Sequence, residues 1–211
     1  MFNKVLSLLG ALIILCSSFS SNAEDIKKLK YGKVTIEELQ MTKYDLDTSA
    51  EAVVLYQYAE FNPQLFNFHQ HYRIKILKKS GTDMASMVFN GKLKNAIKGM
   101  TYNLENSEIV KTRLVSESIF EERVVGNLYR TRIAMPNVKV GSVFEISILM
   151  DGIPNTYEIQ RTIPIVYGGI FLPTHPNVDI RIKEIGYLGY AYKGEEKWII
   201  KDMPAFKMEP Y

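Results

Sequence analysis

Alternation of apolar and polar residues with a period of two runs along most of this chain. In residues 66–77, Phe66, Phe68, Tyr72, Ile74 and Ile76 alternate with polar side chains. Because successive side chains of a strand point to opposite faces, this pattern predicts a strand with one buried face. We expect the other face, with His69, His71 and Arg73, to lie in solvent. The same pattern predicts strands at residues 52–60, 85–90, 96–104, 108–112, 119–125, 128–135 and 143–150.

Helical periodicity is scarce, and one helix start is clear. The sequence Thr35-Ile36-Glu37-Glu38 is a capping box, in which a threonine hydroxyl and a glutamate three residues later each bind the other's backbone amide. It predicts a short helix that ends near Gln40.

The composition changes after Met150, where six of the eight prolines lie. Prolines interrupt strands, so strands here should be short and separated by irregular segments. Alternation still predicts strands at residues 178–182 and 198–201. Many antiparallel strands with little helix indicate an all-β fold, an antiparallel β-sandwich of two packed sheets with one short N-terminal helix.

The first segment has the pattern of a secretory signal peptide. Lys4 precedes an apolar run at residues 5–15, and Ser21-Asn22-Ala23 supplies small residues for cleavage. The alternatives are a membrane anchor, for which the apolar run is short, and a lipoprotein acylated at Cys16, which the bulky Leu15 disfavours. We expect cleavage before Glu24 and export to the periplasm.

Three regions follow from these patterns. Residues 1–23 are the signal peptide, residues 24–202 form the β-sandwich module, and residues 203–211 form an exit segment that leads away from it. A sub-boundary within the module can be placed near residues 151–156, where the composition changes.

Charge and cysteine content exclude several kinds of function. The full chain has 26 Lys plus Arg, 23 Asp plus Glu, and one cysteine. Removal of residues 1–23 takes away Lys4 and Cys16, which lowers the net charge from +3 to +2 and leaves no cysteine. A nearly neutral chain disfavours nucleic acid as a partner. Without cysteine, the processed chain has no disulfide, thiolate nucleophile or cysteine metal site.

His69 and His71 are the one candidate pair of metal ligands, because alternate residues project from the same strand face. A zinc site needs at least a third protein ligand, and none stands nearby in sequence. No serine nucleophile motif or phosphate-binding loop is present either. We therefore expect no catalytic residue, no metal and no cofactor.

A group of late aromatic residues is the remaining candidate site. Exposed aromatic rings stack on sugars or hold peptides, so these residues are candidate contacts for a ligand. The alternative is ordinary packing within the sandwich, with the tryptophan buried. The group consists of Tyr187, Tyr190, Tyr192 and Trp198.

Several segments, in order, resemble an exported bacterial domain of unknown function. The matching stretches are Val34-Thr35-Ile36-Glu37-Glu38-Leu39, Glu51-Ala52-Val53-Val54-Leu55-Tyr56, Arg73-Ile74-Lys75-Ile76-Leu77, Thr101-Tyr102-Asn103-Leu104-Glu105-Asn106 and Ile133-Ala134-Met135-Pro136-Asn137-Val138-Lys139-Val140-Gly141-Ser142-Val143. They cover most of residues 29–163. In that family of Bacteroidetes-type proteins, the domain precedes a transglutaminase-like, papain-type catalytic domain with a Cys, His and Asp triad.

The resemblance implies an all-β accessory module rather than an enzyme. Residues 204–211 resemble the junction to the catalytic domain, which we expect to be missing from this chain, so no catalytic residue can be carried over.

We therefore expect a non-catalytic exported accessory or binding module without a transmembrane segment after processing. Its partner would be a transglutaminase-like or other periplasmic protein, or a cell-wall glycan or peptide. The alternative is a periplasmic glycan-binding or peptide-binding module that uses the late aromatic residues. A stand-alone enzyme is the least favoured alternative.

Overall fold

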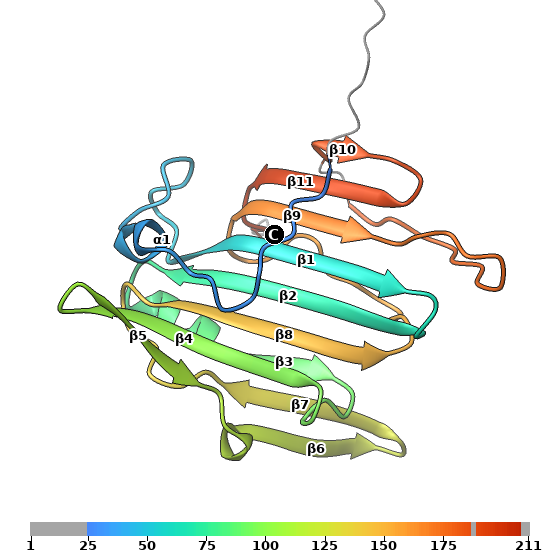
Figure 1. Cartoon of the computed structure of the whole chain (residues 1–211), viewed down its shortest axis with the longest axis horizontal. Coiled ribbons are helices and arrows are strands. Elements are labelled where there is room, and N and C mark those ends of the chain that lie inside the picture. The colour runs from blue at the N-terminus through green and yellow to red at the C-terminus, as the bar shows by residue number, and fades with distance from the viewer. Residues whose placement is uncertain (1–24, 187–188, 208–211) are drawn as a thin grey trace, which may run out of the picture.

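The computed structural model describes residues 25–186 and 189–207, which form two β-sheets packed face to face (Figure 1). Residues 1–24, 187–188 and 208–211 lie outside the described residues, so the predictions made for them stay predictions. The strands of the first sheet are β1 (Ala52–Asn62), β2 (Asn67–Ile76), β4 (Ile97–Glu105), β5 (Glu108–Arg113), β8 (Val143–Asp151), β9 (Ile165–Phe171), β10 (Tyr192–Lys193) and β11 (Lys197–Met203). The second sheet contains β3 (Ser86–Asn90), β6 (Ile119–Val125) and β7 (Leu128–Ala134).

The large sheet has the strand order β10-β11-β9-β1-β2-β8-β4-β5, and the small sheet has the order β3-β7-β6. Neighbouring strands are antiparallel except for β1 and β9, which are parallel. The prediction of an all-β sandwich is confirmed. Strands before and after residues 151–156 belong to the same large sheet.

The core lies between the two sheets, as the alternation predicted. Ile74 and Ile146 of the large sheet and Ile133 of the small sheet are buried in one apolar cluster. A second cluster, around Phe61 and Phe68, is covered by irregular segments instead of strands, with Tyr157 among the residues packed against it. Burial of these side chains supplies the main stabilisation of the fold.

In the proline-rich part of the chain, one strand was missed and one predicted strand is absent. No strand was predicted at β9, where Gly168 and Gly169 interrupt the apolar residues. Both glycines are buried in close contacts, and a β-carbon at Gly169 would lie 2.8 Å from Ile26 Cγ2. Conversely, residues 178–182 alternate but are not a strand. Val178 and Ile180 pack on the second cluster while their backbone has no neighbouring strand, apart from a bridge between His175 and Val178.

The predicted helix is confirmed as α1 (Ile36–Gln40). Two short 3-10 helices follow later in the chain, η1 (Ser80–Ala85) and η2 (Ser116–Ser118). The Thr35 hydroxyl accepts from the Glu38 amide at 3.2 Å, and the Glu38 carboxylate accepts from the Thr35 amide at 2.8 Å. Within the described part of the chain, no helix has the length and apolar character to cross a membrane.

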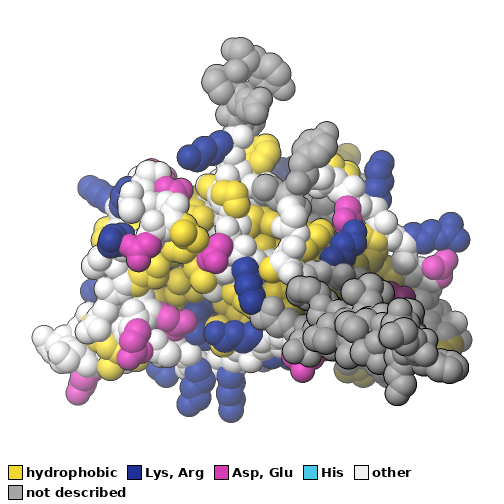
Figure 2. Space-filling model, turned by 90° about the horizontal axis from the view of Figure 1, so that it is seen from above, with side chains coloured by type: hydrophobic (Ala, Val, Ile, Leu, Met, Phe, Trp, Pro, Cys, Tyr) yellow, Lys and Arg dark blue, Asp and Glu magenta, His cyan; other side chains and the backbone are white. Residues whose placement is uncertain are grey.

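Residues 25–34, which we call the strap, run in front of β9, β1 and β2 before they reach α1 (Figure 1). They cover the face of the large sheet that points away from the small sheet, which we call the outer face. The Lys27 amide donates to the Tyr167 hydroxyl at 2.7 Å, and the Leu29 amide donates to the Tyr56 hydroxyl at 3.1 Å. Seen from above, Lys and Arg side chains project from several sides of the molecule (Figure 2).

Candidate functional site

The outer face carries polar side chains in rows that run across neighbouring strands. One row is formed by Tyr58, His71, Ser147 and Lys98, which are paired in register on β1, β2, β8 and β4. In the adjacent row, Arg73 of β2 is paired with Glu145 of β8. The strap covers the middle of this face and leaves one end open.

Glu145 is the centre of a buried polar network beneath the strap. Its carboxylate accepts hydrogen bonds from Arg73 at 3.0 and 2.7 Å, from the Tyr102 hydroxyl at 2.8 Å and from the Gly32 amide at 2.7 Å, and it lies 3.0 Å from His71 Nε2. Burial by itself would raise the pKa of Glu145. The His71 hydrogen bond, the Arg73 charge and the Gly32 amide outweigh it and lower the pKa to about 2.

Helix α1 closes this network from the other side. The Arg73 guanidinium also binds the Glu38 carboxylate, at 2.7 and 3.0 Å, so the capping residue of the helix has a second role. Lys75 Nζ donates to the carbonyl oxygens of Leu39 and Gly141, both at 2.6 Å. Burial lowers the pKa of Lys75 to about 8.

The prediction that this strand face lies in solvent was wrong. His71 and Arg73 are 3% and 2% exposed, and Lys75 is fully buried, whereas His69 is partly buried. The strap and α1 cover the face, and Glu145 and Glu38 compensate the buried positive charge. Buried charges are tolerated when they are paired and hydrogen-bonded, so a polar strand face need not be a solvated one.

Because the pKa of Glu145 is lowered in the folded protein, the stability of the fold should depend on pH. A carboxyl whose folded-state pKa lies below its ordinary value of 4.5 stabilises the fold when it is charged, and this stabilisation is lost as the pH falls from 4.5 toward 2. We expect the free energy of unfolding, measured with urea, to fall more steeply below about pH 5 in the wild type than in Glu145→Gln. Parallel curves for the two proteins would show that the network does not titrate in this way.

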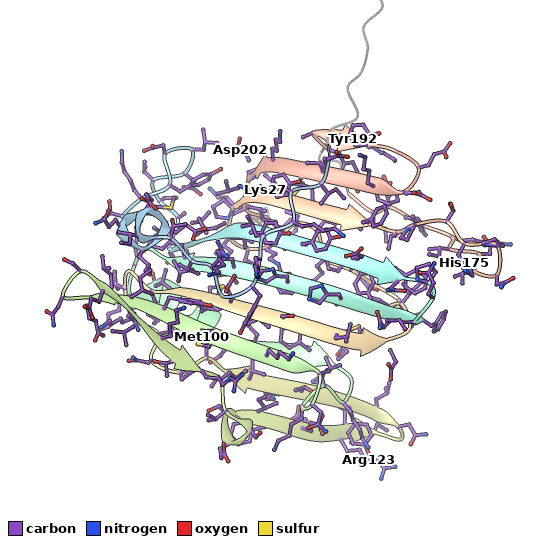
Figure 3. The ribbon with its side chains drawn as sticks, in the orientation of Figure 1. Lys27, Met100, Arg123, His175, Tyr192 and Asp202 are labelled. Carbon is purple, nitrogen blue, oxygen red and sulfur yellow. The ribbon has the colours of Figure 1, made fainter. Side chains whose placement is uncertain are left out.

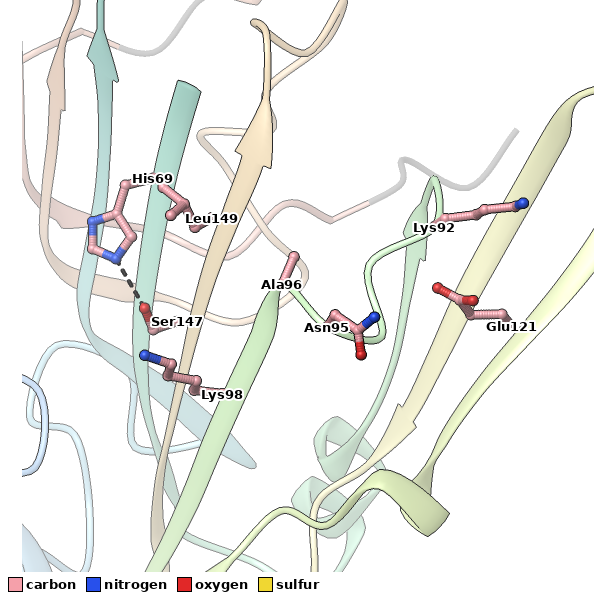
Figure 4. Close-up of a pocket in the computed structure, with 8 residues that line it drawn as sticks. All are labelled: His69, Lys92, Asn95, Ala96, Lys98, Glu121, Ser147 and Leu149. Carbon is pink, nitrogen blue, oxygen red and sulfur yellow. Dashed lines mark hydrogen bonds between the residues drawn. The ribbon is translucent and has the colours of Figure 1, made fainter. Parts of the chain in front are cut away.

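An open pocket of about 620 Å³ lies at the uncovered end of the outer face (Figure 4). His69, Ser147 and Lys98 lie on one side of it, and Lys92 and Glu121 on the other. Asn95, Ala96 and Leu149 complete the lining. The pocket therefore brings together side chains from β2, β8, β4, β6 and the loop between β3 and β4.

His69 and Ser147 are in direct contact, with His69 Nε2 lying 2.9 Å from Ser147 Oγ. Burial lowers the pKa of His69, and the nearby His71 lowers it further, so the imidazole is neutral at pH 7. Glu60, the acid paired with His69 in register, is held by Lys28 at 2.8 Å and by the Tyr58 hydroxyl at 2.8 Å. Its carboxylate is thus directed to the strap and to β1.

Lys98 is the cation of this pocket that is available to a ligand. It is exposed, and within the described ranges its ammonium group has no hydrogen bond or ion pair. Lys92, by contrast, lies 4.0 Å from the centre of the Tyr129 ring, and Glu121 accepts from the Lys94 amide at 2.9 Å. An ammonium beside a hydroxyl and an imidazole is a suitable site for an anionic oxygen.

The two histidines of the candidate metal pair bind different partners. His69 contacts Ser147, whereas His71 contacts Glu145 in the buried network. Within residues 25–186 and 189–207, no group of three or more His, Cys, Asp or Glu side chains is arranged to hold a metal ion.

The structure separates the late aromatic residues that the sequence grouped. Trp198 is 6% exposed and its Nε1 donates to Glu184 at 3.3 Å. Tyr192 is paired with Ile199, the neighbour of Trp198, so the two rings lie on opposite faces of the sheet. Tyr190 is partly buried against the main core. A role for Tyr190 or Tyr192 in ligand contact stays a prediction.

Sequence reasoning did not find Ser147 or Lys98. Each lies in a predicted strand, at a polar position of the alternation, which signals an outward side chain but no chemistry. They lie near His69 because β2, β8 and β4 are neighbours in the sheet. Strand order cannot be predicted from local periodicity.

Comparisons with known proteins add little. No protein-family model matches the chain, and no curated protein matches it. Among solved structures, the chain is similar to a candidate protease from Parabacteroides distasonis, with a TM-score of 0.46 and 10% sequence identity. The match covers 75% of this chain and 37% of that chain, so this chain spans well under half of its length. A likeness at this level carries no argument about function.

Proposed function

We propose that this protein is a non-catalytic, exported accessory module that binds an anionic ligand in the pocket around Lys98. The observation that carries the proposal is the unpaired Lys98 ammonium, which stands in register with Ser147 beside the neutral His69. A carboxylate can accept hydrogen bonds from the ammonium and the hydroxyl together. For an exported protein, carboxylate-bearing cell-wall peptides are the ligands of this chemistry that we favour.

The composition of the pocket also supports binding over catalysis. In a serine hydrolase, a third group orients the histidine that activates the serine. Glu60 is the acid placed beside His69 in the sheet, and it binds Lys28 and Tyr58 instead. The rest of the titratable cluster on this face is buried in the network around Glu145, where it holds the strap and α1.

We expect soluble muropeptides with free carboxylates to bind the protein in a calorimetric titration, and Lys98→Ala to weaken binding. Loss of a hydrogen bond to a charged group costs about 1.5 to 3 kcal/mol, which corresponds to roughly tenfold to a hundredfold in affinity. Lys94→Ala is the matched control, because Lys94 is an exposed lysine of the neighbouring loop and does not line the pocket.

Equal loss of affinity in the two variants, or unchanged binding of peptides with amidated carboxyl groups, would contradict the proposed site.

The 2.9 Å contact between His69 Nε2 and Ser147 Oγ favours a second candidate function, that of a serine hydrolase. If this pair were a nucleophile and its base, a fluorophosphonate probe would label the wild type and not Ser147→Ala. We expect no labelling of either protein. Labelling that is lost in Ser147→Ala would replace the accessory module with a hydrolase.

A further inference from the structure

The hairpin of β6 and β7 ends in an exposed apolar tip at the edge of the molecule. Val125 and Leu128, which are paired across the turn, are each 65% exposed, and Val124 is 47% exposed. Figure 3 places Arg123 at the end of this hairpin, on the outer edge of the small sheet. Large aliphatic side chains grouped at one protruding turn are typical of a surface that contacts a membrane or another protein.

Positive charge and an aromatic ring surround this tip. Arg123 precedes the three aliphatic residues and Arg130 follows them, and neither forms an ion pair among the described residues. Arg123 instead donates to the carbonyl of Gly126 in the turn. The Lys92 ammonium lies over the ring of Tyr129, 4.0 Å from the ring centre. The charge of Glu122 is compensated by Arg132 at 3.0 Å.

We propose that the β6–β7 hairpin tip, defined as residues 123–130, binds the surface of a membrane that contains anionic phospholipids. Aliphatic side chains at the tip would enter the boundary between headgroups and acyl chains. Arg123 and Arg130 would stay at the level of the phosphates, as long cationic side chains do at such interfaces. Tyr129 has the apolar ring and polar hydroxyl that suit the same depth.

The charges of β6 argue against a second copy of this chain as the occupant. Strand β6 is the free edge of the small sheet and carries Glu121, Glu122 and Arg123 in succession. Charged side chains on an edge strand are a common protection against edge-to-edge pairing.

Membrane contact through the hairpin tip would orient the protein with its pocket near the lipid surface. Lys92 lines the pocket and also contacts Tyr129 of the hairpin. A molecule that rests on the hairpin tip would therefore hold its ligand pocket close to the lipid surface. The membrane contact does not depend on the ligand, so either proposal can fail without the other.

The test is co-sedimentation of the chain that starts at Glu24, which keeps all the described residues, with vesicles of equal parts phosphatidylglycerol and phosphatidylcholine. We expect the wild type to bind these vesicles and to bind pure phosphatidylcholine vesicles much less. The double variant Val125→Asp/Leu128→Asp should lose at least about tenfold in partitioning. Both positions are largely exposed, and thermal unfolding of the variant should match the wild type.

A charge series separates a specific contact from general attraction. Arg130→Gln should lower binding about fivefold, which is the effect of one cation at an anionic surface. Lys33→Gln removes the same charge from an exposed position next to α1 and should leave binding unchanged.

Equal vesicle binding by the wild type and the double aspartate variant would overturn the proposal. Sedimentation velocity tests the alternative partner, a second copy of this chain, by measuring whether the protein forms a dimer. If the wild type does not bind vesicles but forms a dimer that the aspartate variant loses, the tip is a protein interface and the membrane assignment is wrong.

Discussion

Replacement of Glu145 by alanine is expected to lower the free energy of unfolding by about 3 to 5 kcal/mol, because removal of one partner leaves buried opposite charge uncompensated. Arg73 would keep its Glu38 partner and a 3.4 Å hydrogen bond to the Lys30 carbonyl oxygen. The Gly32 amide and the Tyr102 hydroxyl would lose the acceptor they share. Urea denaturation followed by circular dichroism measures this change.

The control for this variant is Glu105→Ala, which breaks the exposed ion pair with Lys139 at 2.7 Å. Exposed pairs contribute about 0 to 1 kcal/mol, so this variant should unfold close to the wild type. A Glu145 variant as stable as the Glu105 variant would mean that water enters the network or that the strap leaves the outer face.

Replacement of Ile74 by alanine is expected to cost about 2 to 5 kcal/mol, through lost burial and the cavity that remains. Ile74 is 2% exposed in the cluster between the two sheets. Ile182→Ala, at a side chain that is 49% exposed, should change the free energy of unfolding by less than about 0.5 kcal/mol. The same denaturation experiment compares them, and a similar effect in both would mean that the sheets do not pack across β2.

The outer face explains why this protein has titratable groups of two kinds. Those beneath the strap, centred on Glu145, bind each other and attach the strap and α1 to the sheet. His69 and Lys98 lie beyond the strap, in the pocket with Ser147. The first set therefore belongs to stability and the second to the proposed ligand contact, although both use polar positions of the same strands.

The fold class could be predicted from local pattern because alternation is a local property. Phe68, Tyr72, Ile74 and Ile76 are buried as their spacing required, and the capping box at Thr35 formed its two hydrogen bonds. In each case, the residues that determine the outcome are neighbours in sequence. The signal peptide and the resemblance to an exported domain rest on the same kind of local evidence, and they stay predictions.

What only the tertiary structure decided was the environment of each strand face. Alternation shows that two faces differ, and it cannot show that a second segment covers the polar one. The strap comes from residues 25–34 and Glu145 from a strand about 70 positions after Arg73, so the burial of Arg73 depends on contacts that are distant in sequence. The pocket has the same origin. His69, Ser147 and Lys98 each occupy an ordinary polar position, and they become a site because β2, β8 and β4 are neighbours in the sheet.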